Sequence, residues 1–399
     1  MLGLKKVDYL TLIMFAMIIL CDIINVFPIA YAHIVFMIWL FLMAFHNKKA
    51  IKSFFLGRSC RPIWGYCTIL ILTSIIGSSF IWGAKISLSF IMGMSPAIAY
   101  NYYRSSNQNI KPLTIVLLLI LFIMAIYASY IGSKYEDLGR SITAGVYDGD
   151  MMAFGGVALA SGAAVFAVYL VGKLHSLSLK WKIILLPLIL VMISMVITSG
   201  STISSVCLLI FLCLAIINVK YRILLWFVMI SITILFFAFY QEIGLAIIQF
   251  SYSVDDAVSS MRLRSLGSAI IYGSSGGDGD YFFGRIDRPL LSLQTFLNNP
   301  FFGVAYKYGN DWNRALSYGV GCHGEWADAL ARFGILGLVY FKIFANFLQE
   351  PLRNQKNKMW FWIWIVMGLF NPAVSFFSNL ILFFIIPATS TSFFNNENK

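Results

Sequence analysis

The sequence predicts an all-α protein that crosses a membrane many times. Its 399 residues are 60% hydrophobic and only 12% charged, whereas soluble domains carry about 25% charged residues. Apolar runs long enough to cross a bilayer recur along the chain, and a helix satisfies its own backbone there. The net charge is +12, but the basic residues lie in short loops between the apolar runs. This sorting indicates membrane topology and argues against a nucleic-acid partner.

Residues 1–241 form the first predicted unit, which holds about nine spans. The first span follows Lys5 and Lys6 and lacks a small-residue cleavage site, so we expect a retained helix rather than a signal peptide. The segment HNKKAIKSFFLGRSCR is basic without an acid and is placed in the cytoplasm, whereas the acid-bearing segment 133–150 is placed outside. The spans are expected at about 7–27, 28–45, 63–83, 86–103, 112–132, 151–172, 183–199, 203–219 and 223–241.

Residues 242–325 form the second unit, a single large loop on the outer face. The loop begins with LAIIQFSYSV, which is apolar enough to lie along the membrane surface. It continues through the glycine-rich turn YGSSGGDGD and an amphipathic helix at about 286–298. Because the loop is long, its arginines do not bear on the orientation of the chain.

Residues 326–399 form the third unit. A tenth span ends near Leu348, and we assign two short spans to 359–393, divided at Asn371-Pro372. This gives about twelve spans with both termini in the cytoplasm. Of the six cysteines only Cys322 lies in an outer loop, so neither a disulfide framework nor a metal site is expected. Since no phosphate-binding loop, dinucleotide fingerprint or serine-hydrolase elbow is present, we expect no cofactor.

The stretch GCHGEWADALARFGILGLVYF, 321–341, carries polar groups directly into a membrane span. Its residues Trp326, Ala329, Leu330 and Phe333 form one apolar helical stripe. On the other side, Asp328 and Arg332 are one turn apart and can pair. Because polar groups in a bilayer are costly and usually functional, this stretch is the candidate site.

The outer loop also concentrates groups that can bind or react. Guanidinium groups bind diphosphates and carboxylates through two oxygens, and the loop holds Arg262, Arg264, Arg285, Arg288 and Arg314. These arginines can instead meet lipid headgroups or the loop's own aspartates. His323 is a candidate general base, or alternatively a cap of the following helix. Glu325 is interpreted as an acid at a helix start, with a ligand for a substrate hydroxyl as the alternative.

Two spacings resemble those of the O-antigen ligase and O-antigen polymerase superfamily. The ligase pattern is His, then Asn, Ser or Gln, nine residues, Gly, two residues, and Gly, Thr or Tyr. Here His323, Gly324, Gly334 and Gly337 stand at these positions, with Gly324 as the departure. The family also has an arginine about fifteen residues before a Pro-x-x-Gly turn.

That loop arginine maps to Arg285, which lies fifteen residues before Pro300 of the turn Pro300-x-x-Gly303. The large outer loop before the third-last span and the number of spans also match. The family often has a further arginine where Thr202 stands here. Its role would then pass to Arg288, Arg264 or Arg314.

The resemblance implies a GT-C-type membrane glycosyltransferase in a bacterial inner membrane, with its site on the periplasmic side. Its donor would be a glycan on undecaprenyl diphosphate, with the lipid diphosphate as leaving group. Arg285 and His323 would be the catalytic residues, and Arg288, Arg264, Arg314 and Glu325 would be candidates for substrate binding. Membrane lipids, a chain-length regulator and a flippase of the same pathway would be its partners.

Gly324 and the acids of HGEWADALARFG favour a polymerase, which transfers the chain to another lipid-linked repeat. A ligase, which transfers it to lipid A-core, stays open as the alternative. A transporter or flippase for a lipid-linked oligosaccharide is the alternative from another class, and a non-catalytic assembly scaffold is a third interpretation. Transporters more often have interrupted helices in matching halves, and the sequence indicates one interruption, at Asn371-Pro372.

Overall fold

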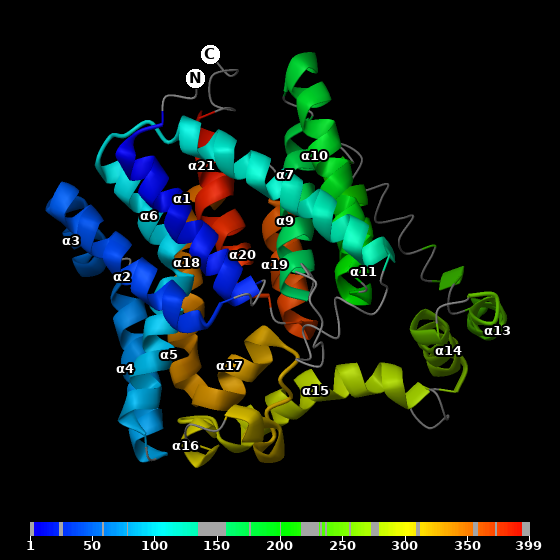
Figure 1. Cartoon of the computed structure of the whole chain (residues 1–399). Coiled ribbons are helices and arrows are strands. Elements are labelled where there is room, and N and C mark those ends of the chain that lie inside the picture. The colour runs from blue at the N-terminus through cyan, green and yellow to red at the C-terminus, as the bar shows by residue number, and fades with distance from the viewer. Residues whose placement is uncertain are drawn as a thin grey trace.

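The protein is a bundle of helices (Figure 1). The computed structural model describes residues 4–23, 27–57, 60–77, 79–134, 157–174, 177–199, 201–216, 231, 234–235, 238–254, 257–272, 279–308, 312–353, 358–371 and 373–392. Every regular element within these ranges is helical, as the sequence predicts. The predicted span at 223–241 and the acid-bearing segment 133–150 fall largely outside the described residues.

Within the described residues, the N-terminal half of the chain contains ten α-helices and one π-helical turn. They are α1 (Lys6–Ile18), η1 (Ile19–Ile23), α2 (Ile29–His46), α3 (Lys48–Leu56), α4 (Arg61–Ile76), α5 (Phe80–Gly93), α6 (Ser95–Ser105), α7 (Lys111–Lys134), α9 (Val157–Leu174), α10 (Leu179–Thr198) and α11 (Thr202–Ile216).

The C-terminal half contains the elements around the candidate site. They are α13 (Tyr240–Ser251), α14 (Ala257–Tyr272), α15 (Gly279–Asn298), α16 (Ala305–Tyr308), η5 (Trp312–Tyr318), α17 (Glu325–Phe333), η6 (Gly334–Gly337), α18 (Leu338–Arg353), α19 (Met359–Phe370), α20 (Phe376–Leu380), η7 (Ile381–Ile385) and α21 (Ile386–Ser392).

Several helices are long and apolar enough to cross a membrane. Four qualify by themselves: α2, α7, α10 and the run Glu325–Gln349. Two bent pairs, α3 with α4 and α5 with α6, raise the number to six among the described residues. The chain is therefore a helical membrane protein. The predicted span at 86–103 is broken, since α5 and α6 meet at Met94 with a bend of 50°.

The predicted basic loop between the second and third spans contains a helix. Its residues Ala50, Ile51 and Phe54 are buried, whereas Lys49 and Lys52 are exposed. The spacing of these apolar residues places them on one helical face, which packs against α6. The charge of this segment predicts a cytoplasmic loop, and its buried apolar stripe makes that loop a helix.

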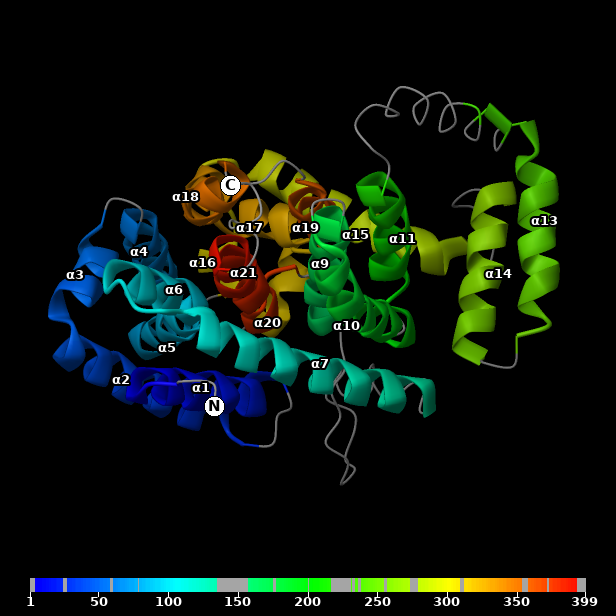
Figure 2. The same ribbon diagram turned by 90° about the horizontal axis from the view of Figure 1, so that it is seen from above.

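The segment α20–η7–α21 forms the centre of the bundle (Figures 1 and 2). Its apolar side chains are fully buried, including Ile381, Leu382 and Phe384. The predicted division of the last region is present, because α19 ends at Phe370 and α20 begins at Phe376. The Asn379 side chain donates to the Gly93 carbonyl (2.9 Å), which ties this central segment to the break between α5 and α6.

Three helices around the end of the predicted outer loop gather at one end of the bundle. In Figure 1, α15, α16 and α17 lie at the bottom with the turn between α4 and α5, while α1 begins and α21 ends near the top. The predicted amphipathic helix at 286–298 is found within α15, which begins earlier, at Gly279.

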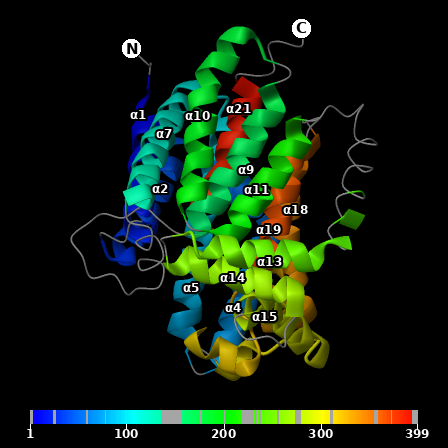
Figure 3. The ribbon, with the colours of Figure 1, turned by 90° about the vertical axis from the view of Figure 1, so that its right-hand side faces the viewer.

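The helices α13 and α14 form a hairpin across the direction of the bundle (Figure 3). They approach closely at Gly244 and Gly267, where a Cβ atom on Gly267 would lie 2.7 Å from the Gly244 carbonyl oxygen. Leu245 and Phe250 on α13 are exposed. A sideways hairpin with exposed apolar side chains is typical of a segment that lies in the membrane surface.

A buried polar cluster joins α1, α2 and α6. The Asp8 carboxyl is 2% exposed and accepts from the Tyr103 hydroxyl (2.6 Å) and the Lys5 backbone N–H (2.7 Å). The Trp39 indole donates to Thr11 (3.2 Å), which also lies close to the Tyr103 hydroxyl (3.5 Å). Each buried polar group thus finds a partner, as a low-dielectric interior requires.

We predict that Tyr103→Phe destabilises the protein, because it leaves Asp8 short of a hydrogen-bond donor. A buried acceptor left unsatisfied costs about 1–3 kcal/mol. The thermal midpoint in detergent should therefore fall in this variant. The matched control is Tyr9→Phe on α1, where the tyrosine is exposed, and equal midpoints for the two variants would refute the prediction.

Candidate functional site

His323 lies in the tight loop that joins η5 to α17. The loop is held by two hydrogen bonds, from the Val320 N–H to the Ala315 carbonyl (3.0 Å) and from the Gly321 N–H to the Ser292 hydroxyl (2.7 Å). Nδ1 of His323 lies 2.8 Å from the Cys322 carbonyl oxygen. Since a carbonyl oxygen only accepts, Nδ1 carries the hydrogen, and the neutral ring has its lone pair on Nε2.

Arg288 on α15 contacts this imidazole. Its Nη1 atom lies 3.1 Å from Nε2 and 3.3 Å from Nδ1 of His323. One atom at these distances from both ring nitrogens must lie over the face of the ring, because in the ring plane it would collide with Cε1. The contact places a permanent positive charge beside a potential base, although 35 residues separate the two in the sequence.

Two glycines allow the histidine loop to pack this closely. A Cβ atom on Gly321 would collide with the Arg288 carbonyl oxygen, and one on Gly324 would lie 2.6 Å from the Leu369 carbonyl oxygen. The loop is therefore pressed between α15 and the end of α19. The departure of Gly324 from the ligase pattern has a steric explanation, because the backbone here leaves no space for a side chain at this position.

Ser292 connects α15 to both sides of the site. Its hydroxyl donates to Asp328 Oδ1 (2.6 Å) and accepts from the Gly321 N–H (2.7 Å). Asp328 also acts electrostatically on Arg332, the partner expected one turn along α17. Arg332 extends towards the loop, where its Nη2 atom lies 3.9 Å from the Cys322 sulfur. Burial raises the pKa of the nearby Tyr308, and the Arg332 guanidinium opposes that rise.

The turn after α15 is clamped to the junction of α17 and η6. Gly303 and Gly334 both have left-handed φ angles, +62° and +61°. The Val304 N–H donates to the Ala331 carbonyl (3.0 Å), and the Ile335 N–H donates to the Pro300 carbonyl (2.7 Å). The spacings that carry the family resemblance thus correspond to a physical contact between two backbone segments.

Glu325 begins α17 and holds the site to the membrane helices. Its Oε1 atom accepts from the Tyr340 hydroxyl on α18 (2.5 Å), and its Oε2 atom accepts from the Val374 N–H (3.3 Å). The neighbouring Trp326 donates to the Ile365 carbonyl (2.8 Å). Both carboxylate oxygens have internal partners, so this arrangement gives Glu325 a structural role.

The other predicted residues lie at different places. Arg285 is on α15, three residues before Arg288 and so on the same side of that helix, although its side chain lies outside the described part. The guanidinium carbon of Arg264, on α14, lies 5.0 Å from the ring centre of Tyr252. Arg314 is exposed on η5, and Thr202 begins α11.

Sequence reasoning missed Ser292 and Tyr340. Ser292 follows Arg288 by one helical turn on an amphipathic helix, a spacing that marks a shared face. Tyr340 gave no such signal, because a tyrosine in a membrane helix is ordinarily packed against other apolar residues. Among the described residues, no group of three His, Cys, Asp or Glu side chains is arranged to hold a metal ion.

No protein-family model matches this chain, and a search of curated proteins finds no significant match.

We predict that Gly324→Ser lowers the thermal midpoint, because the added Cβ atom meets the Leu369 carbonyl oxygen. Overpacking of this kind costs about 1–3 kcal/mol. The matched control is Gly65→Ser on α4, where a Cβ atom would meet only a Val339 methyl group at 3.4 Å. The steric argument fails if the two serine variants melt together in the same detergent.

We also predict that Glu325→Gln and Tyr340→Phe each destabilise the protein and that their effects are not additive. The glutamine amide replaces one of the two accepting oxygens, and the phenylalanine removes one donor. Residues that share a hydrogen bond typically show a coupling of about 0.5–3 kcal/mol. Thermal midpoints of the two single variants and the double variant measure this coupling, and additive effects would contradict it.

Proposed function

We propose that this protein is a membrane glycosyltransferase that joins oligosaccharide repeat units carried on undecaprenyl diphosphate, as O-antigen polymerases do. The observation that carries the proposal is the contact between Arg288 and His323. It pairs an anion-binding group with a potential base at the entry of a helix into the membrane. The family resemblance of 284–340 supports the same assignment.

In the proposed reaction a hydroxyl oxygen of the acceptor sugar attacks the anomeric carbon of the donor. The bond between that carbon and the diphosphate oxygen breaks, and the hydroxyl proton passes to Nε2 of His323. A single in-line displacement inverts the anomeric carbon. Arg288 and Arg285 stabilise the charge that develops on the leaving diphosphate, and no cofactor or metal takes part.

Binding of the donor also acts on the base. Diphosphate oxygens are stronger, charge-assisted partners for the Arg288 guanidinium than the imidazole face over which it lies. When the guanidinium turns to the diphosphate, it removes a positive charge that opposes proton transfer from the acceptor hydroxyl to Nε2. Nδ1 stays bonded to the Cys322 carbonyl, which keeps the ring oriented.

The proposed topology has about twelve spans in a bacterial inner membrane and places 242–325 in the periplasm. The gathering of α15, α16 and α17 at one end of the bundle supports it (Figure 1). The sideways hairpin of α13 and α14 would lie in the outer surface of the membrane (Figure 3). A chain-length regulator and a flippase of the same pathway are the expected protein partners.

Gly324 favours a polymerase over a ligase, because the contact with Leu369 leaves no space for the Asn, Ser or Gln of the ligase pattern. A transporter of lipid-linked oligosaccharide is the second candidate. It is favoured by two interrupted helical segments, at Met94 and at 371–375, which the bond from Asn379 to Gly93 brings close together.

We predict that Arg288→Ala and Arg285→Ala abolish long glycan chains and that His323→Ala does the same. Loss of an electrostatic donor costs about 10²–10³-fold in rate, and loss of a general base costs about 10²–10⁴-fold. The rates are measured on purified protein in proteoliposomes supplied with undecaprenyl-diphosphate-linked repeats. Lys307→Ala, an exposed cation of the same loop, should polymerise normally.

The glycan phenotype of a gene deletion separates the candidates. A polymerase deletion leaves core capped with a single repeat. A ligase deletion leaves bare core and accumulates lipid-linked polymer. Altered sidedness of the lipid-linked precursor, with normal polymerisation in vitro by the His323→Ala protein, would overturn the enzyme proposal in favour of transport.

A further inference from the structure

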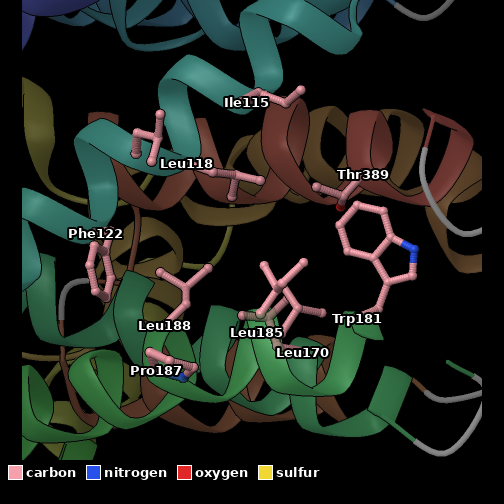
Figure 4. A pocket seen from close by; sticks show the side chains of 11 residues that line it. Ile115, Leu118, Phe122, Leu170, Trp181, Leu185, Pro187, Leu188 and Thr389 are labelled. Atoms are coloured by element: carbon pink, nitrogen blue, oxygen red, sulfur yellow. The ribbon is translucent and has the colours of Figure 1, made fainter. Parts of the chain in front are cut away.

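An apolar pocket of about 480 Å³ lies between α7, α9, α10 and α21, away from the candidate site. Figure 4 shows Leu118 and Phe122 of α7 facing Leu185 and Leu188 of α10 across the space. Trp181 and Thr389 lie at one end of it (Figure 4). Its volume is within the range of about 300–1,000 Å³ that is typical of ligand pockets.

The lining of the pocket has few polar groups that could bind water. The Thr389 hydroxyl already donates to the Ile385 carbonyl (2.7 Å) and meets the Tyr169 hydroxyl (3.0 Å). Apolar cavities without polar partners stay dry and hold apolar contents. Among the lining residues, Leu119 is 53% exposed and Ile184 52%, so the pocket opens towards the lipid side of the bundle.

Four lysines lie within about one helical turn, along the chain, of residues that line the pocket. Lys180 and Lys182 flank Trp181, and Lys173 follows Leu170 of the lining by one helical turn. Lys111 starts α7, one turn before Ile115 of the lining. The sequences of α7, α9, α10 and α21 contain no acidic residue. Tryptophan and lysine at a span end are typical of the headgroup level of a membrane.

We propose that this pocket binds one acyl chain of an anionic phospholipid, whose phosphate lies among the lysines at its mouth. The occupant belongs to the leaflet that contains the start of α10. Charge complementarity selects an anionic headgroup, and a dry apolar pocket open to the bilayer selects a hydrocarbon chain. The site is separate from Arg288 and His323 and does not depend on the proposed reaction.

The test uses the full chain in phosphatidylcholine vesicles that contain phosphatidylglycerol with a photoactivatable diazirine on one acyl chain. After irradiation, labelled peptides are mapped by mass spectrometry. We expect labelling at 115–122 and 181–188 several-fold above that of other lipid-facing helices. Leu118→Trp fills the pocket and should remove this excess. The control Ile123→Trp, an exposed α7 position outside the pocket, should retain it.

The charge at the mouth is tested by Lys180→Gln combined with Lys182→Gln. This variant should lower labelling by phosphatidylglycerol about 30-fold, from the usual contribution of two basic residues to anionic-lipid binding. Labelling by a diazirine phosphatidylcholine should not change. Because Lys180 is exposed and Lys182 partly exposed, these substitutions test the proposal even where Leu118→Trp fails to fold. Even labelling of all lipid-facing helices, or equal labelling of the wild-type pocket by both lipids, would overturn it.

Discussion

The geometry around His323 depends on close contact between backbone segments at glycine positions. Because Gly321 has no side chain, the backbone of α15 can lie against it, and the end of α19 lies against Gly324 in the same way. The segment around Gly303 lies against the backbone before Gly334, and Gly334 lies against the backbone before Gly303. Because packed backbone cannot move aside as a flexible side chain can, these contacts leave the loop very little freedom.

The loop also contains a strained residue. Cys322 has φ +58°, a left-handed conformation that costs a non-glycine residue about 1–2 kcal/mol. Such a conformation persists where its surroundings over-determine it. Here they are the two flanking glycines and the hydrogen bond from the Gly321 N–H to Ser292. The strain points the Cys322 carbonyl at Nδ1 of His323 and so sets the tautomer of the ring.

The two acids of α17, Glu325 and Asp328, have hydrogen-bond partners inside the protein that hold the site together. Glu325 and Asp328 both use their oxygens on internal donors, Tyr340 and Ser292 among them. A buried carboxylate without such partners would be costly. Arg288 and His323 are partly exposed, as is Glu325, whereas Asp328 is buried.

Much of this arrangement follows from local patterns. The apolar stripe from Trp326 to Phe333 predicts α17, the amphipathic pattern at 286–298 predicts most of α15, and Asn371-Pro372 predicts the end of α19. These local patterns do not predict which residues contact each other between helices. A period of 3.6 residues indicates which face of a helix is apolar, but not which helix it meets. Several arginines were therefore candidates for binding the diphosphate, and only the structure shows that Arg288 contacts His323.

The contact between Arg288 and His323 has a consequence for the order of events in the proposed reaction. The lone pair on Nε2 of His323 points outward in the ring plane, while the Arg288 guanidinium lies over the ring face and places a positive charge beside that base. An acceptor hydroxyl that arrives first meets a base whose protonation this charge opposes. A donor diphosphate that arrives first offers Arg288 a stronger, charge-assisted partner and draws the positive charge away from the base. In the proposed reaction, the residue that binds the leaving group therefore also opposes proton transfer to His323 until the donor is in place.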